Sequence, residues 1–191
     1  EKTYAMPPAG FAMAMRFDDS DALAEAVRGW DLDFRQLDRG RIDARLGHVA
    51  TQGVLMTECG LSRRMEQHGA PPSGFRTFAI PANDAMKVRW RGTDHSGENL
   101  MLFRLGSDLD SISDSRFHVF TVSIAEELLA SAAGPRGLTS FEQLDAGSDV
   151  ITCPDPARHR LRQLVANLME SASRLPMPWR MTIRSTIASI W

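Results

Sequence analysis

The sequence has only two cysteines and no long apolar segment, and each shortage excludes a class of protein. Cys59 and Cys153 lie far apart and form no CxxC pair, so neither a disulfide framework nor a zinc knuckle is expected. The apolar stretch at 11–15 is followed at once by Arg16 and acidic residues, unlike a signal peptide or a membrane span. These features predict a protein of the reducing cytoplasm, with no membrane partner and no export.

An excess of positive charge is also missing. Lys and Arg number 22 against 24 Asp and Glu, which leaves a net charge of -2 and no general attraction to nucleic-acid phosphates. The 191 residues suffice for one domain with a small helical addition, but not for two full domains. Because the sequence starts at Glu1 and stops within a helix-like pattern, we expect the natural chain to be longer at both ends.

Motifs of common enzymes are lacking as well. The sequence contains no GxSxG elbow, P-loop, dinucleotide-binding GxGxxG or HExxH. The histidines do not form the HxH pair with a following Glu that metal-binding β barrels present. Glu58 and Glu66 are isolated acids with nothing converging on them by spacing. We therefore predict no catalytic residue, no metal and no cofactor.

What is present between Trp30 and Val122 is a series of short apolar stretches separated by Gly, Pro, Asn and Asp. Tight glycine-containing connections, such as the one at 51–53, are typical of antiparallel hairpins. The pattern predicts a small antiparallel β barrel or a jelly roll, since no helix is long enough for a parallel crossover. The expected strands are 34–37, 42–49, 53–59, 63–68, 75–80, 86–90, 100–105 and 117–122.

Helical patterns flank this region. Asp19 or Ser20 can cap a short helix over 21–28, and a second helix is expected over 124–133 before Gly134 and Pro135. The strongest helical pattern runs from Pro156 to Ser173 and is followed by a possible last helix over 179–191. We therefore expect an α+β, mainly β, chain with three parts. These are a flexible arm (1–16), the barrel with its preceding helix (17–134) and a helical dimerisation and linker segment (135–191).

Scattered positions give a resemblance to a known family. They are Phe17-Asp18-Asp19, Gly29-Trp30, the LDRG tetrapeptide at 37–40, Arg63-Arg64 followed by Gly69, Pro72 and Gly74, and then Trp90-Arg91-Gly92 and Phe103-Arg104. In these positions the chain resembles the N-terminal regulatory domain of bacterial AraC-family transcription regulators. The resemblance implies a cupin-like barrel that senses a small-molecule effector and helices that form a homodimer. It also implies contact with promoter DNA only through a C-terminal helix-turn-helix domain, which is absent from this sequence.

Candidate binding residues follow from alternation along the strands. Met86, Val88 and Trp90 share a face opposite the cations of their strand, so we expect Trp90 to point into the barrel. His118 and His48 share their faces with the apolar residues of their own strands. We predict Trp90, His118 and His48 as effector-binding residues, against the alternative that they are core or rim residues.

The helix over 156–173 carries an apolar stripe made of Leu161, Leu164, Val165 and Leu168. We predict that this stripe pairs two subunits, with packing on the chain's own barrel as the alternative. Two other functions stay open at this point. One is a metal-independent cupin-type enzyme such as an isomerase, and the other is an interaction module whose barrel is filled by its own side chains.

Overall fold

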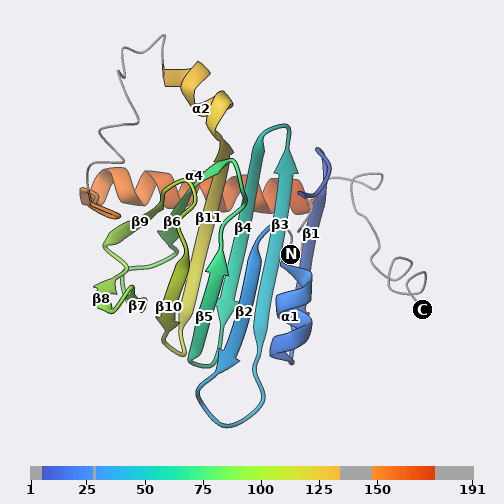
Figure 1. The fold of residues 1–191 in the computed structure, drawn as a ribbon, viewed down its shortest axis with the longest axis vertical. Coiled ribbons are helices and arrows are strands. Elements are labelled where there is room, and N and C mark those ends of the chain that lie inside the picture. Colours follow the sequence, from blue (N-terminus) through green and yellow to red (C-terminus); the bar gives the residue numbers. More distant parts are fainter. Residues whose placement is uncertain (1–5, 28, 134–147, 175–191) are drawn as a thin grey trace, which may run out of the picture.

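The structure is a computed structural model that describes residues 6–27, 29–133 and 148–174 (Figure 1). Its strands form two sheets in which every neighbouring pair is antiparallel. The first has seven strands in the order β1 (Ala12–Phe17), β3 (Ala44–Thr51), β4 (Val54–Leu61), β11 (Phe117–Ala125), β6 (Phe75–Pro81), β9 (Asn99–Phe103) and β12 (Val150–Thr152). The second has five, in the order β2 (Asp31–Gln36), β5 (Met65–Ala70), β10 (Leu109–Ser113), β7 (Lys87–Trp90) and β8 (Thr93–Ser96).

The hairpin between β3 and β4 shows why the chain folds in this way. Thr51 pairs with Val54, so only Gln52 and Gly53 make the turn, and Gly53 has a positive φ of 77° that residues with a side chain rarely adopt. The glycine thereby fixes the register of the whole hairpin, from Ala44 opposite Leu61 to the turn itself.

Three helices are described. In α1 (Ser20–Ala26) the Asp19 carboxylate accepts hydrogen bonds from the backbone N–H groups of Asp21 and Ala22 at 2.8 and 2.9 Å, so Asp19 is the capping residue. The second helix, α2 (Glu126–Ala133), starts later than expected because 124–125 are the end of β11. The third, α4 (Asp155–Arg174), matches the strongest helical pattern of the sequence. None of the described helices is both long and apolar enough to cross a membrane.

The predicted class, mainly β with antiparallel sheets followed by a helix, is confirmed, and all eight expected strands are present with shifted ends. Four strands were not predicted: β1, β8, β10 and β12. Most of β1 lies in the segment expected to be a flexible arm, and β12 lies in the segment expected to be helical. Each of these four adds to a sheet through backbone pairing, which needs no strong apolar period. The expected helix over 179–191 lies outside the described residues.

The core is divided by the seven-stranded sheet. One apolar cluster lies between the two sheets, with Leu46, Leu55, Met86 and Phe103 among its members. A second cluster lies on the other face of the seven-stranded sheet, beneath α4, which runs across these strands in Figure 1. Both faces of this sheet are therefore buried over much of its area.

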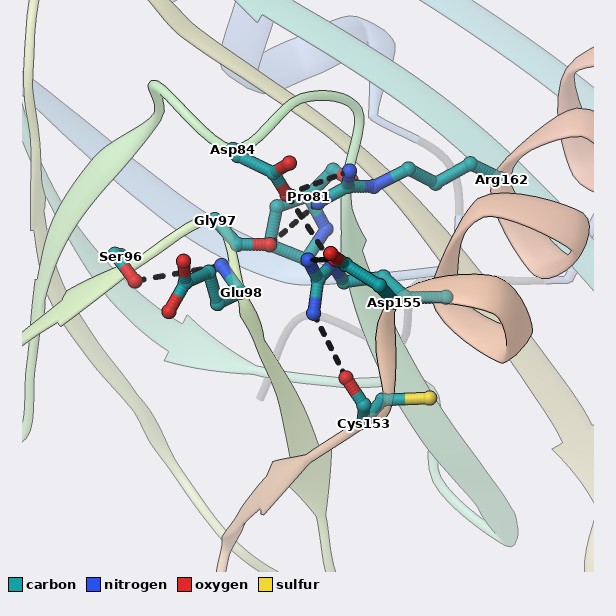
Figure 2. A network of polar contacts seen from close by, with 9 residues as sticks. Pro81, Asp84, Ser96, Gly97, Glu98, Cys153, Asp155 and Arg162 are labelled. Atoms are coloured by element: carbon teal, nitrogen blue, oxygen red, sulfur yellow. Dashed lines mark hydrogen bonds and ion pairs between the residues drawn. The ribbon is translucent and has the colours of Figure 1, made fainter.

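Polar contacts hold the first turns of α4 against the strand ends (Figure 2). Arg162 donates to the backbone carbonyls of Pro81 and Gly97, and its guanidinium lies 2.7 Å from the Asp84 carboxylate. Arg158, nearly buried, contacts the same carboxylate at 3.1 Å and donates to the Cys153 carbonyl at 2.7 Å. Asp84 thus links two arginines of α4 to the loop after β6.

We expect Asp84→Asn to destabilise the protein near neutral pH and to have a smaller effect in acid. The hydrogen bond from Arg162 lowers the pKa of the Asp84 carboxyl below its usual value of 3.8. A lowered folded-state pKa means that the stabilisation is complete above the unfolded-state pKa and is lost as the pH falls through the folded-state value. The difference between wild type and variant in urea unfolding should therefore be constant down to about pH 4 and shrink below it.

Asp33→Asn is the matched control, because Asp33 is an exposed carboxylate on β2. Its stability should stay close to that of the wild type at neutral pH, where the deficit of Asp84→Asn is expected to be complete. A deficit of Asp84→Asn that does not shrink in acid would show that the carboxylate charge is not what holds α4.

Candidate functional site

The space between the two sheets contains a cavity, called the interior cavity below. Its volume is about 60 Å³, well above the roughly 10–15 Å³ that one water molecule needs. Its wall is largely aromatic, with Trp30, Phe34, Trp90, Phe103 and Phe117. The cavity is therefore large enough to hold more than a single water molecule.

One wall of the cavity is a row of residues across the five-stranded sheet. Phe34 of β2 is opposite Gln67 of β5, which is opposite Ser111 of β10, which is opposite Trp90 of β7. All four residues line the interior cavity. Because paired residues of neighbouring strands project to the same face, the row places an amide, a hydroxyl and an indole side by side.

The facing wall is the corresponding row of the seven-stranded sheet. His48 of β3 is opposite Thr57 of β4, which is opposite Thr121 of β11, which is opposite Ala79 of β6. Thr57, Thr121 and Ala79 line the interior cavity. His48 is fully buried, and its Nδ1 lies 2.9 Å from the Thr57 hydroxyl. The row thus forms a polar band in an otherwise apolar wall.

Trp90 lies where alternation along its strand predicted, on the inward face of β7 and against the interior cavity. It is 4% exposed, and its ring meets Phe103 edge to face with centroids 4.6 Å apart. His48 is not among the described residues that line the interior cavity: its Nδ1 contacts the Thr57 hydroxyl, whose residue does line it, and His48 itself lines the groove beneath α4.

His118 lies on the opposite face of its sheet. In β11 the alternate residues Phe117, Val119 and Thr121 line the interior cavity, whereas His118 lines a groove beneath α4. Its Nε2 is 2.8 Å from a Glu58 carboxylate oxygen, and this hydrogen bond lowers the pKa of the Glu58 carboxyl. The structure therefore brings His118 together with Glu58, and not with Trp90.

The apolar stripe of α4 is also divided. Val165 is 4% exposed in the cluster on the chain's own sheet, and Leu161 packs against the same cluster. Leu164 and Leu168 are 56% and 45% exposed. The stripe thus meets both the barrel and the solvent, with Leu164 and Leu168 on the solvent side.

Several cavity residues were not singled out from the sequence, above all Gln67, Thr57, Thr121 and Ser111. The sequence signal that could have identified them is a polar residue on the apolar face of an alternating strand, as with Thr57 between Leu55 and Cys59. Pairing then concentrates such residues in one band, which no single strand reveals.

Among the described residues that line the interior cavity, Cys59 is the one titratable side chain, and burial raises the pKa of its thiol to about 12. The thiol is therefore protonated at neutral pH, and a neutral thiol is a poor nucleophile. In the described part of the chain, no three His, Cys, Asp or Glu side chains gather closely enough to hold a metal ion. The described wall of the interior cavity thus combines apolar and aromatic side chains with neutral hydrogen-bonding groups.

The class that this architecture defines is an antiparallel two-sheet β barrel with a C-terminal helix packed on one sheet. Among solved structures, the AraC-like transcriptional activator CuxR has a similar fold, with a TM-score of 0.54 and 13% sequence identity over 85% of this chain and 60% of that chain. A mutant of the Bacillus subtilis oxalate decarboxylase OxdC also matches, with a TM-score of 0.31 and 16% identity over 85% of this chain and 39% of that chain. No family model and no curated protein sequence matches this chain significantly.

At this identity the likeness concerns the fold alone, and this chain spans about 60% of the length of the AraC-like activator. The resemblance expected from the scattered positions of the sequence is confirmed at that level. The fold is that of a domain found in an AraC-like regulator.

We expect Thr57→Val to destabilise the protein and Thr121→Val to leave its stability unchanged or raise it. Valine keeps the shape of threonine, but at position 57 it removes the bond to His48, at a cost of roughly 1–3 kcal/mol. The Thr121 hydroxyl has no hydrogen-bond partner among the described residues, so its removal leaves no group unpaired. Equal losses in urea unfolding of the two variants would refute this assignment of the polar band.

Proposed function

We propose that this chain is the effector-sensing and dimerising domain of an AraC-type transcription regulator. It binds a small molecule in the interior cavity and passes the signal to a DNA-binding domain outside this sequence. The observation that carries the proposal is the cavity between the sheets, lined by aromatic rings and a polar band, in a fold similar to that of an AraC-like activator. We propose that the protein is cytoplasmic. We also propose that it contacts promoter DNA through the DNA-binding domain outside this sequence.

The proposal favours binding over catalysis. A metal-independent cupin-type enzyme would need a titratable group in contact with its substrate to move a proton or to attack it. The wall of the interior cavity supplies Cys59 for that purpose, and its thiol stays protonated. Hydroxyl, amide and indole groups bind and orient a guest instead.

Dimerisation is assigned to the exposed part of the α4 stripe. Leu164 and Leu168 are one helical turn apart on the same face, and each is about half exposed. Exposed leucines at this spacing are the pattern of a helix that pairs with a second helix. Leu161 and Val165 pack α4 against the barrel, and this packing orients Leu164 and Leu168 toward the second subunit.

A thermal-shift screen of small metabolites tests the sensing function. An effector should raise the melting temperature of the wild type and of His118→Ala, because His118 lies outside the interior cavity. The same compound should give a much smaller rise with Trp90→Ala, since Trp90 lines the cavity. A compound that protects wild type and Trp90→Ala equally would place the effector site elsewhere.

Light scattering tests the dimer. At micromolar concentration we expect the mass of two chains for the wild type and of one chain for Leu164→Asp, since a buried carboxylate without a partner opposes association. Leu37→Asp is the control, because Leu37 is an exposed leucine outside α4, and it should stay dimeric. A wild type that is already monomeric would contradict the assignment of Leu164 and Leu168.

A further inference from the structure

Four hydrogen-bonding groups around the interior cavity have no partner among the described residues. They are the indole nitrogens of Trp30 and Trp90, the amide nitrogen of Gln67 and the hydroxyl of Thr121. Their side chains are 4%, 4%, 5% and 8% exposed in the same order, and all four residues line the interior cavity. Folded proteins rarely leave buried polar groups unpaired, so four around one cavity point to a shared purpose.

These groups have one chemistry in common, because all of them can donate a hydrogen bond. Indole and amide nitrogens only donate, and a hydroxyl can donate or accept. Gln67 and Trp90 belong to the row on the five-stranded sheet, and Thr121 belongs to the facing row. A guest between the two walls therefore meets donors from both sides.

Charge narrows the class of guest further. Among the residues that the structure describes, no Asp, Glu, Lys, Arg or His lines the interior cavity. An ion brought into this space would lose its hydration without gaining a counter-charge, which is strongly unfavourable. The wall therefore selects an uncharged guest.

The aromatic part of the wall sets the shape. Trp30 and Trp90 both meet Phe103 edge to face, at interplanar angles of 87° and 90°. The three rings thus form one connected aromatic surface beside the cavity.

Resting on the proposed sensing function, we infer that the effector is an uncharged, small, largely apolar molecule that carries a hydrogen-bond-accepting oxygen or nitrogen. That acceptor takes one or two hydrogen bonds from the unpaired donors, which are Gln67, Thr121 and the indole N–H groups of Trp30 and Trp90. Phenyl ketones, esters and lactones of similar size belong to this class, whereas carboxylates, phosphates and sugars do not.

Three probes of nearly equal size separate the contributions of charge and acceptor. Acetophenone has a ring and a carbonyl, ethylbenzene has the same outline without the acceptor, and benzoate carries a charge. Binding to the full chain is followed by the ¹H–¹⁵N signals of the indole N–H groups, assigned with Trp30→Phe and Trp90→Phe, and of the Gln67 amide. We expect acetophenone to bind about tenfold more tightly than ethylbenzene and to move these signals downfield, with no saturable effect of benzoate.

Thr121→Val and Gln67→Met each remove one donor while keeping the size of the side chain. Either should weaken acetophenone binding severalfold and leave ethylbenzene binding unchanged, and Thr93→Val, at an exposed position on β8, should change neither.

The outcomes separate the inference from the proposed function. If ethylbenzene binds as tightly as acetophenone, or benzoate binds most tightly, the cavity accepts ligands but the inferred class is wrong. If none of the three probes moves the Trp30, Trp90 or Gln67 signals, the interior cavity takes no such guest, and both the inference and the proposed sensing function are overturned.

Discussion

The burial of the seven-stranded sheet on both faces is the constraint on which the rest of the structure depends. Its inner face meets the five-stranded sheet around the interior cavity, and its outer face meets α4. Strand β11, between β4 and β6, shows the consequence residue by residue. Val119 and Thr121 face the cavity, whereas Phe120 between them lies beneath the helix. The two arginines of α4 that pair with Asp84 hold this helix against the outer face.

Most of the fold could be predicted because it depends on local signals. Alternation of apolar residues and glycine-containing turns marked the inner strands, and Asp19 and the Pro156 region marked two helices. The missed strands are short or carry exposed side chains. In β1 the burial alternates poorly because one edge of the strand is open, and β12 has only three residues. Such strands are specified by the partner that they pair with, and that partner is distant in the sequence.

The candidate site could be predicted only in part, for a related reason. Trp90 follows directly from alternation, since the opposite face of β7 carries exposed cations. In β11 both faces are buried. Alternation therefore places His118 on the same face as Phe120, but it does not tell whether that face meets the interior cavity or α4. A shift of one residue exchanges the two faces, and that choice belongs to tertiary packing. The cross-strand rows that contain Gln67 and Thr121 depend on the registers of several hairpins at once.

The interior cavity and α4 share a wall that is one strand thick. Thr121 lines the cavity and Phe120 lies beneath the helix, and a single planar peptide unit joins the two residues. Any tilt of this peptide unit would move the cavity wall and the surface beneath α4 together, because no other side chains lie between Phe120 and Thr121 along the backbone. Strand β11, which pairs with β4 on one side and β6 on the other, therefore belongs at once to the wall of the interior cavity and to the surface on which α4 packs.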